Sequence, residues 1–297
     1  MNGVPPPLRR IDHVVAIVRD LDSAFAAYTD RVGFPISWQV ESKDGWRSSA
    51  LWLGNASLEL LEPSAEAEGV AGSFFQRALN SRGEGLFLIA FEPPDIDYSV
   101  RALRTRGAQV ADPVAGGVFD SARNDGLRGY VSAFISRRST AGLNSFLCKY
   151  DSPFQPLDGG AGALKVKKLD HVIIATEDVD AAAALWEKNL GLKRDAGLEH
   201  PLGAGFKVAR LPIGDAFIEL VQPVDKEGRF YEQFQQRGEG LFSISVEVED
   251  LEGAVAFLRE NDVKVSDPEA SIWPGARLAR INHEYTHGVS IQLIERR

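Results

Sequence analysis

The sequence is poor in several features that define large classes of protein. It contains one cysteine, Cys148, among 297 residues, which excludes an internal disulfide and indicates a reducing compartment. No apolar run approaches the roughly 20 residues that a membrane-spanning helix needs. The start, MNGVPPPLRR, lacks the apolar segment of a secretory signal. We therefore expect a cytoplasmic protein with no membrane partner.

Positive charge is also scarce. The formal net charge is -9, from 33 Lys and Arg against 42 Asp and Glu, and the chain has no basic stretch. A balance of this sign disfavours nucleic acid and anionic membranes as partners. A content of 44% hydrophobic and 25% charged residues is typical of a soluble globular protein. The length allows about two domains, each with its own core.

One pentapeptide matches a metalloprotease signature. HEYTH, from His283 to His287, satisfies the H-E-x-x-H pattern, which binds zinc when a helix brings both histidines to one face. The flanking residues, 277–282 and 289–294, alternate between apolar and polar, with Gly288 between them. Such alternation predicts two strands around a tight turn, and no third ligand follows at a protease spacing. The sequence therefore argues against a protease.

Internal similarity divides the chain into two copies of one domain. RIDHVVAIVRDLDSAFAAYTDRVGF, from Arg10, returns as KLDHVIIATEDVDAAAALWEKNLGL, from Lys168. RGEGLFLIAFEPPDIDYSVRALRTRGAQVADP, from Arg82, returns without a gap as RGEGLFSISVEVEDLEGAVAFLRENDVKVSDP, from Arg237. Between the copies, the proline- and glycine-rich stretch DSPFQPLDGGAGAL predicts a linker. We expect a first domain over 8–150, a linker over 151–166 and a second domain over 167–297.

Each copy consists of two similar units. In the first unit, IDHVVAIV predicts a strand, the apolar stripe from Leu21 to Val32 predicts a helix, and PISWQVES, WRSSALWLG and ASLELLEP predict three further strands. A second unit, from Gly85 to Tyr150, repeats this order. Gly33 and Gly191 follow the two matching helices as C-terminal caps. The predicted fold class is α+β, with four βαβββ modules.

These ordered motifs resemble the vicinal oxygen chelate (VOC) superfamily, also called the glyoxalase/bleomycin resistance/dioxygenase proteins. The resemblance rests on the DHV strand with its DLD or DVD helix start, on NASLELLEP and GDAFIELVQP, on RGEGLF and on THGVSIQL. It covers nearly the whole chain, and locally it is greatest to methylmalonyl-CoA epimerase. It implies two tandem half-barrel domains, each wrapping a cleft that holds a divalent metal in the enzymatic members.

In the first copy, the resemblance places the four metal-ligand positions on His13, Glu59, Leu88 and Phe146. Two of these side chains are apolar, and two protein ligands are too few to hold a hard divalent ion well. We therefore expect His13 and Glu59 to be a degenerate site in a metal-free first domain. The apolar replacements favour a cleft that binds hydrophobic molecules, as in the resistance members of the superfamily.

In the second copy, the same positions fall on His171, Glu219, Ser243 and Gln292. A glutamine carbonyl is an acceptable oxygen donor, so His171, Glu219 and Gln292 are the expected metal ligands, with Mn, Ni, Zn, Co or Fe as candidate ions. No organic cofactor is expected. Such a metal polarises a carbonyl or stabilises an enolate that carries two vicinal oxygens. Alternatively, His171 and Glu219 form a satisfied polar pair without metal.

Further residues of the second copy complete the candidate site. Glutamine at the fourth position cannot accept a proton at neutral pH, so proton abstraction falls to Glu219 or Glu247, with His171 as the third catalytic candidate. Aromatic residues at helical spacing predict a core stripe or a lid over the cleft; they are Phe230, Tyr231 and Phe234. The candidate substrate contacts are Ser243, Ser245, His200 and Arg210.

Three functions stay open at this point. The first is a metal-dependent lyase or isomerase that acts on a small oxygenated organic acid, ketone or thioester in the second cleft. The second is a metal-free small-molecule-binding protein of the resistance type, and the third is a metal-independent acid-base enzyme that uses His171 and Glu219. An extradiol dioxygenase is disfavoured, because its iron triad needs histidine at Ser243 and glutamate at Gln292. A monomer and a homodimer are both compatible with the sequence.

Overall fold

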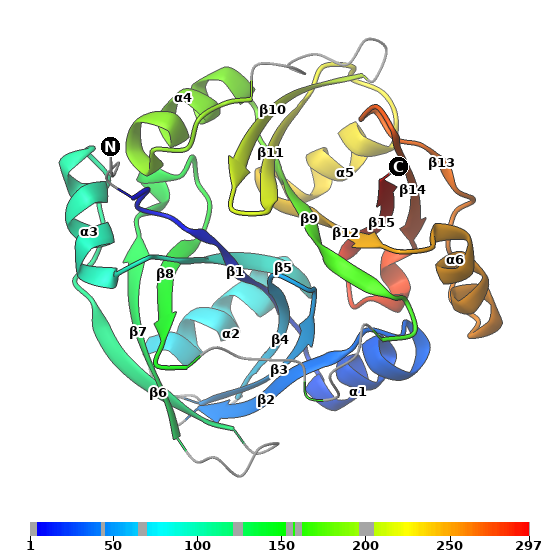
Figure 1. Cartoon of the computed structure of the whole chain (residues 1–297), viewed down its shortest axis with the longest axis horizontal. Coiled ribbons are helices and arrows are strands. Elements are labelled where there is room, and N and C mark those ends of the chain that lie inside the picture. Colours follow the sequence, from blue (N-terminus) through cyan, green and yellow to red (C-terminus); the bar gives the residue numbers. More distant parts are fainter. Residues whose placement is uncertain are drawn as a thin grey trace.

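The fold consists of two curled β-sheets with helices between and around them, as the computed structural model shows (Figure 1). The structure describes residues 5–42, 45–64, 70–120, 127–152, 157, 162–195 and 205–296. Each sheet contains the strands of one sequence copy. The predicted α+β class with two tandem VOC-like sheets is confirmed.

The first sheet is a closed barrel in the order β1-β4-β3-β2-β6-β7-β8-β5. Two residue pairs between β2 and β6, Val40 with Asp120 and Glu41 with Phe119, close the ring. Helix α2 (Val70–Arg82) packs Phe75 against the inner face of this barrel. The strands are β1 (Arg10–Ile17), β2 (Ile36–Ser42), β3 (Trp46–Trp52), β4 (Ser57–Pro63), β5 (Gly85–Glu92), β6 (Val114–Asp120), β7 (Leu127–Ile135) and β8 (Ser145–Tyr150).

The second sheet stays open among the residues that the structure describes, in the order β10-β11-β9-β12-β15-β14-β13. Helix α5 (Arg229–Arg237) lies over its concave side, where Phe230 and Phe234 pack against the sheet. The strands are β9 (Val166–Ala175), β10 (Phe206–Ile213), β11 (Ala216–Pro223), β12 (Gly240–Val248), β13 (Glu269–Ala270), β14 (Ala276–Ile281) and β15 (Ser290–Arg296).

Four helices begin in the same way, because each module carries an aspartate at the helix start. The Asp side chain accepts a hydrogen bond from a backbone N–H of the first turn, which satisfies a donor that the helix leaves free. The caps are Asp20, Asp95, Asp178 and Asp250, which precede α1 (Leu21–Ala26), α3 (Ile96–Thr105), α4 (Val179–Leu190) and α6 (Leu251–Glu260). Helix α1 continues as a π-helix over Ala27–Arg31, and Gly191 ends α4 in the left-handed region at φ 73°.

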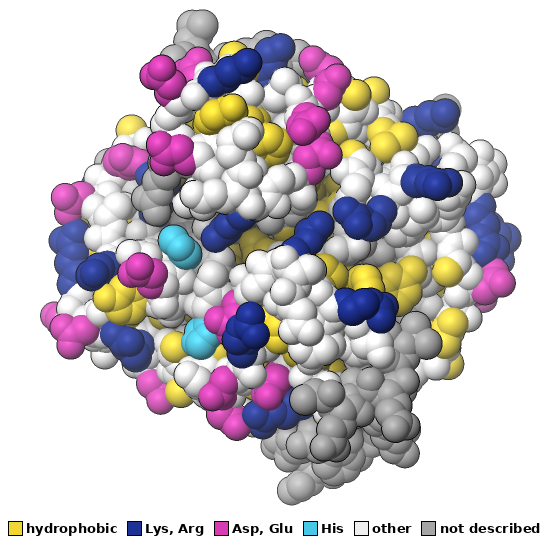
Figure 2. All heavy atoms as spheres, turned by 180° about the vertical axis from the view of Figure 1, so that it is seen from behind, with side chains coloured by type: hydrophobic (Ala, Val, Ile, Leu, Met, Phe, Trp, Pro, Cys, Tyr) yellow, Lys and Arg dark blue, Asp and Glu magenta, His cyan; other side chains and the backbone are white. Residues whose placement is uncertain are grey.

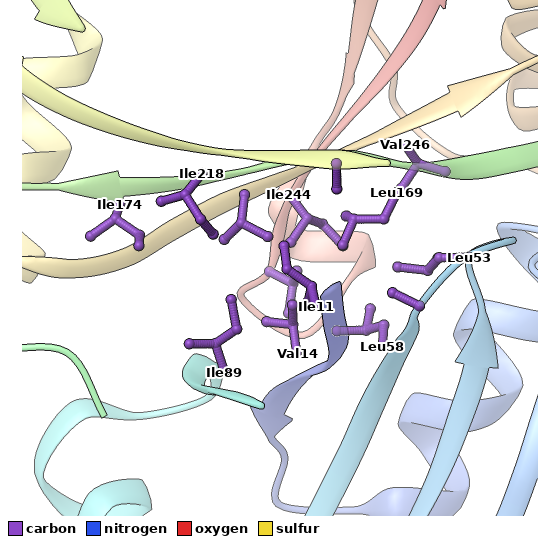
Figure 3. Close-up of a cluster of buried hydrophobic side chains, with 14 of the residues drawn as sticks. Ile11, Val14, Leu53, Leu58, Ile89, Leu169, Ile174, Ile218, Ile244 and Val246 are labelled. Atoms are coloured by element: carbon purple, nitrogen blue, oxygen red, sulfur yellow. The ribbon is translucent and has the colours of Figure 1, made fainter. Parts of the chain in front are cut away.

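The two sheets pack back to back around one hydrophobic core. Side chains on the outer face of the barrel, such as Val14, Leu58 and Ile89, meet Ile218 and Ile244 of the second sheet (Figure 3). The residues that alternate with them, such as His13 and His171, point away from this core into two separate concave faces. Strand alternation therefore places each candidate histidine in a cleft and its neighbours in the shared core.

The HEYTH segment joins two antiparallel strands, as the sequence predicts. After β14 comes a short 3-10 turn over His283–Tyr285, and then β15. His283 lines the second cleft, whereas His287 Nδ1 lies 3.4 Å from Glu84 Oε1 of the barrel. The two histidines therefore lie in different parts of the structure and do not form a protease site.

The described surface and helices give two further observations. Lys and Arg side chains are interspersed with Asp and Glu over the face that Figure 2 shows. Within the described part of the chain, we find no helix with the length and apolar character that crossing a bilayer requires.

Candidate functional site

A β-bulge precedes the candidate histidine in each copy. In β9, Leu169 pairs with Val246 and His171 pairs with Ser245, which leaves Asp170 as the extra residue. A bulge re-aims a side chain that regular alternation would send to the other face, and Asp170 Oδ2 lies 2.7 Å from His171 Nδ1. The Asp-His dipeptide that both copies share could have indicated this contact. Strict strand alternation instead predicts that neighbouring residues point to opposite faces.

The barrel has the same bulge. Ile11 pairs with Phe91 and His13 pairs with Ala90, so Asp12 is the extra residue. Its Oδ2 lies 2.6 Å from His13 Nδ1. Both copies therefore hold the imidazole through Nδ1 and turn Nε2 toward the cleft.

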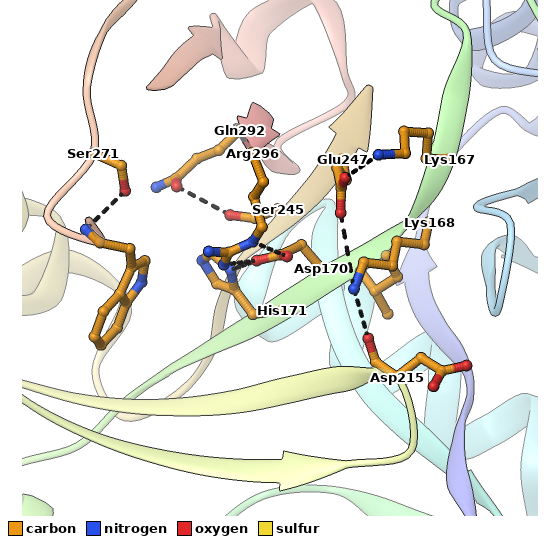
Figure 4. A network of polar contacts seen from close by, with 12 residues as sticks. Lys167, Lys168, Asp170, His171, Asp215, Ser245, Glu247, Ser271, Gln292 and Arg296 are labelled. Carbon is orange, nitrogen blue, oxygen red and sulfur yellow. Dashed lines mark hydrogen bonds and ion pairs between the residues drawn. The ribbon is translucent and has the colours of Figure 1, made fainter. Parts of the chain in front are cut away.

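An ion pair with the partly exposed Arg296 fixes the buried Asp170 in the second copy. Asp170 is fully buried, and Arg296 donates to it through Nε and Nη2, both at 2.7 Å (Figure 4). Burial alone raises the pKa of Asp170, but hydrogen bonds from Arg296 and His171 outweigh it and hold this pKa well below the ordinary value. An ionised carboxylate only accepts hydrogen bonds. Nδ1 of His171 therefore carries a proton, and in the neutral ring Nε2 presents a lone pair.

Glu219 faces that lone pair. Its Oε2 lies 3.5 Å from His171 Nε2, and its Oε1 is buried without a hydrogen-bond partner among the described residues. Arg210 Nε approaches Oε1 only to 3.7 Å. Burial raises the pKa of Glu219, and the charges of His171 and Arg210 oppose this rise. The carboxylate thus keeps acceptor capacity in a nearly dry position.

The donor set fits a divalent ion. Two neighbouring ligands, each about 2.1 Å from a metal, lie roughly 3 Å apart, which is close to the separation of 3.5 Å between His171 Nε2 and Glu219 Oε2. A metal-bound histidine usually donates its other ring N–H to a carboxylate, as His171 does to Asp170. The histidine geometry and the incompletely hydrogen-bonded carboxylate of Glu219 are both compatible with a metal centre.

Gln292 lies at the same end of the cleft on β15. Its Oε1 accepts a hydrogen bond of 3.0 Å from Ser245 Oγ (Figure 4), and an amide oxygen has a second lone pair for another partner. Ser245 therefore orients Gln292 and does not itself line the cavity. Ser243 does line it, and its Oγ donates to the carbonyl of Ser290 at 2.9 Å.

Three other sequence candidates do not face the cavity or fall outside the described chain. Glu247 is buried and forms ion pairs with Lys167 and Lys168 away from the cavity (Figure 4), so the structure does not bring this base candidate to the site. Arg210 stacks on the rings of Phe217 and Trp273 at 3.4 and 4.6 Å and contacts Glu219. His200 lies outside the described residues.

The cavity itself has a volume of about 500 Å³. His171, Glu219, Ser243 and Gln292 form its polar end. Its remaining wall is largely apolar, and the mouth carries Glu269, Arg280 and His283. Sequence reasoning did not find most of this wall, whose members are Ile173, Phe206, Val208, Val221, Phe230, Phe242, Trp273 and Leu278.

The barrel cavity that His13 and Glu59 both line is smaller and more aromatic than the second cleft. His13 Nε2 lies 3.3 Å from Glu59 Oε2, but the cavity beside them measures about 120 Å³. The ring of Phe146 stands edge-on to His13 at 5.5 Å, at the position that Gln292 has in the second copy, and Leu88 is fully buried opposite. Burial raises the pKa of Glu59. The barrel therefore retains the histidine–glutamate pair but lacks the polar side chains that Ser243 and Gln292 supply in the second copy.

A separate carboxylate group lies outside both clefts. Asp250, Glu252 and Glu295, near the start of α6, have ligand atoms close enough to surround an ion. Their carboxylates already accept from other groups: Asp250 from Gly253 N–H, Glu295 from Leu251 N–H and Glu252 from Arg277. These contacts cap and anchor the helix and explain the cluster without a metal.

Comparison with known proteins agrees with this arrangement. The glyoxalase-like domain family model matches residues 11–169 and 169–281, and the chain belongs to this family within the VOC superfamily. Human (Homo sapiens) methylmalonyl-CoA epimerase is 28% identical over 123 residues, which cover 41% of this chain and 69% of that protein. The ethylmalonyl-CoA/methylmalonyl-CoA epimerase of Cereibacter sphaeroides is 32% identical over 102 residues, covering 34% and 75%.

A solved structure matches both copies at once. A mutant of 4-hydroxymandelate synthase from Streptomyces coelicolor superposes with a TM-score of 0.69 and 16% identity, covering 99% of this chain and 93% of that one. At this identity the likeness shows the fold alone. The epimerases each span less than half of the chain, so the two-sheet arrangement is shared with the synthase.

Proposed function

We propose that the protein is an isomerase or lyase of the VOC superfamily, which acts on a small oxygenated acid, ketone or thioester in the second cleft. One observation carries this proposal. His171 Nε2 and Glu219 Oε2 stand 3.5 Å apart at the polar end of a cavity of about 500 Å³, with Nδ1 of the same histidine held by Asp170. A preorganised histidine and carboxylate at a cavity of this size are typical of a catalytic site.

His171, Glu219 and Gln292 would hold a divalent metal, and superfamily members commonly use one. When bound, such an ion supplies Lewis-acid polarisation of a carbonyl and stabilises enolate charge. Asp170 keeps His171 in the tautomer that exposes the Nε2 lone pair. Ser245 orients Gln292 through its 3.0 Å hydrogen bond.

We assign proton transfer to Glu219. It is the carboxylate at the polar end of the cavity, because Glu247 is bound by two lysines elsewhere and Glu269 lies at the mouth. While Oε2 faces His171 Nε2, Glu219 Oε1 is buried without a hydrogen-bond partner among the described residues, so this second oxygen is available to accept a proton. The apolar wall around it excludes water from the proton that it would take.

An exchange experiment tests this assignment. The α-protons of methylmalonyl-CoA and of a panel of 2-oxo acids are followed by ¹H NMR in D₂O, with protein incubated with Zn²⁺ or Co²⁺. We expect exchange with wild type and with Glu59→Gln, and at least a hundredfold slower exchange with Glu219→Gln, because general-base catalysis contributes about 10²–10⁴-fold. Equal rates for Glu219→Gln and wild type on every exchanged compound would contradict the assignment.

The barrel supports a second function, the binding of a small apolar molecule without a metal. Seven aromatic rings line its cavity of about 120 Å³, and aromatic walls with few polar groups are typical of binding sites for apolar ligands. The wall residues are Trp38, Trp46, Phe75, Tyr130, Phe134, Phe146 and Tyr150. Quenching of Trp38 and Trp46 fluorescence by small apolar ligands, lost in Phe146→Glu, tests this function.

A further inference from the structure

We infer that the substrate of the second cleft carries a ring-sized apolar group, so that its class is an aryl-substituted, or similarly bulky, oxygenated acid. This inference rests on the proposed function and specifies the substrate of the same site. It follows from the shape and chemistry of the wall that continues from the polar end.

Four aromatic side chains from four different segments form that wall. Phe206 comes from β10, Phe230 from α5, Phe242 from β12 and Trp273 from the segment before β14. The ring centroids of Phe206 and Phe230 lie 5.8 Å apart, and those of Phe230 and Phe242 lie 4.8 Å apart. These separations are within the range of favourable aromatic contacts. An aromatic ring of the substrate could therefore make the same kind of contact with these side chains.

A second bulge brings one of these rings to the site. Leu241 pairs with Ile174 and Ser243 pairs with Ile173, which leaves Phe242 as the extra residue of β12. Phe242 and Ser243 therefore both line the cavity, although they are neighbours in one strand. The bulge places an aromatic ring next to the polar end, where an apolar group attached to the reacting carbon would lie.

The volume of the cavity exceeds the needs of a three- or four-carbon acid. A cavity of about 500 Å³ lies in the range of roughly 300–1,000 Å³ that holds drug-sized ligands. A small acid at His171 and Glu219 would leave Phe206 and Phe230, which are only half buried, facing water. Burying them against a ring releases that water and favours binding.

The mouth of the cavity has little charge with which to hold coenzyme A. Besides His171, Arg280 and His283 are the basic side chains among the described lining residues, and Arg280 already forms an ion pair with Glu269. Phosphate groups are bound chiefly by Arg, Lys and backbone N–H groups, so a free acid suits this mouth better than a coenzyme A thioester.

A pair of 2-oxo acids tests the inference, because phenylglyoxylate and pyruvate share the same oxygens and differ in a phenyl against a methyl group. Their dissociation constants are measured by titration calorimetry with the full chain, with Zn²⁺ and with EDTA. We expect phenylglyoxylate to bind at least about tenfold more tightly, as burial of a phenyl group predicts. Acetyl-CoA is expected to bind no more tightly than pyruvate.

Matched variants show where the preference arises. The double variant Phe206→Leu and Phe230→Leu keeps an apolar wall but removes two rings, and should reduce the preference to less than about threefold. Phe25→Leu is the control, since Phe25 is a partly buried ring that packs on the shared core and lines neither cavity. It should leave the preference unchanged.

The outcomes separate the inference from the proposed function. Equal affinity of the wild type for both acids would overturn the inference, and so would a ring preference that survives in the double variant. If the two acids bind equally well and binding requires Zn²⁺, the inference is overturned but the metal centre is supported. A ring preference that is the same in EDTA would support the inference and count against the metal-dependent function.

Discussion

Arg296 and Asp170 form a two-bond ion pair beneath the second cleft, with both N···O distances at 2.7 Å. In the barrel, Tyr150 takes the strand position of Arg296, since Tyr150 pairs with Tyr130 as Arg296 pairs with Ala276. Besides His13, the described residues give Asp12 one ion-pair neighbour, Arg10, at 3.8 Å. The two copies therefore share the Asp–His–Glu arrangement but differ in how firmly the aspartate is held.

The first prediction concerns this aspartate. Asp170→Asn should weaken metal binding about 10–100-fold, as loss of the partner of a ligand histidine commonly does, because the amide no longer fixes the Nδ1–H tautomer. Competition with a chromophoric chelator measures the affinity. Asp12→Asn is the matched control and should leave it unchanged. Unaltered affinity in Asp170→Asn would show that the aspartate has no role at the metal.

The second prediction is a pH dependence of stability. The folded-state pKa of Asp170 lies well below its ordinary value of 3.8, so near that pH the unfolded chain binds more protons than the folded one. Asp170 therefore contributes stability above pH 3.8, and this contribution is lost as the pH falls toward the folded-state pKa. In Arg296→Met the pKa of Asp170 is less depressed. Urea unfolding between pH 6 and pH 3 should therefore show a smaller decrease in the free energy of unfolding than in the wild type. An identical slope in both proteins would count against this linkage.

The third prediction concerns Arg210, whose charge lowers the pKa of Glu219 against the effect of burial. Protons compete with a metal for this carboxylate, so metal binding should weaken as the pH falls through the raised pKa. Arg210→Met should move the midpoint of this decline to higher pH. Affinity measured across pH gives the midpoint. Arg280→Met, which removes a basic residue at the cavity mouth, should leave the midpoint in place; equal shifts in both variants would indicate a general charge effect.

The fourth prediction adds a ligand charge. Gln292→Glu places a carboxylate in the cavity that His171 and Glu219 also line, and affinity for hard divalent ions rises with the charge of the ligands. We expect binding to tighten at least about tenfold at neutral pH. Chelator competition against the wild type provides the comparison. If affinity is unchanged, position 292 lies outside the ligand set.

The fifth prediction tests the packing between the sheets. A Cβ at Gly54 would lie 1.9 Å from the carbonyl oxygen of Lys167, whereas a Cβ at Gly83 meets nothing within 4 Å. Their φ values are +80° and +77°, so both alanine variants carry a similar backbone strain of about 1–2 kcal/mol. In Gly54→Ala, the free energy of unfolding should fall by about a further 2 kcal/mol, because the added methyl group overpacks this contact. Similar free energies of unfolding for the two variants would contradict the observed contact.

The sequence was sufficient for the fold because its repeats are long and its helix starts are explicit. The two RGEGLF stretches and the capping aspartates at Asp20, Asp95, Asp178 and Asp250 each correspond to a module in the structure. Local hydrogen bonding and apolar periodicity determine these features, so they can be read from single segments.

The candidate site was predictable only in part, because regular alternation fails where strands bulge. The family resemblance assigned His171 and Glu219 to one site, but the sequence also offered Glu247 as a base of that site and gave no role to Asp170 or Phe242. The bulges at Asp170 and Phe242 depend on pairing between strands that lie far apart in the sequence. The aromatic wall similarly combines a strand, a helix and the segment that carries Trp273, which no local pattern links.

The number of metal ions that each chain binds tests the proposed metal centre of the second cleft directly. Native mass spectrometry of untagged protein, titrated with Zn²⁺ and Co²⁺, gives this number for wild type, His13→Ala and His171→Ala. We expect one ion per chain in wild type and His13→Ala and none in His171→Ala. No ion in wild type, or an ion that persists in His171→Ala and is lost in His13→Ala, would contradict a metal centre in the second cleft.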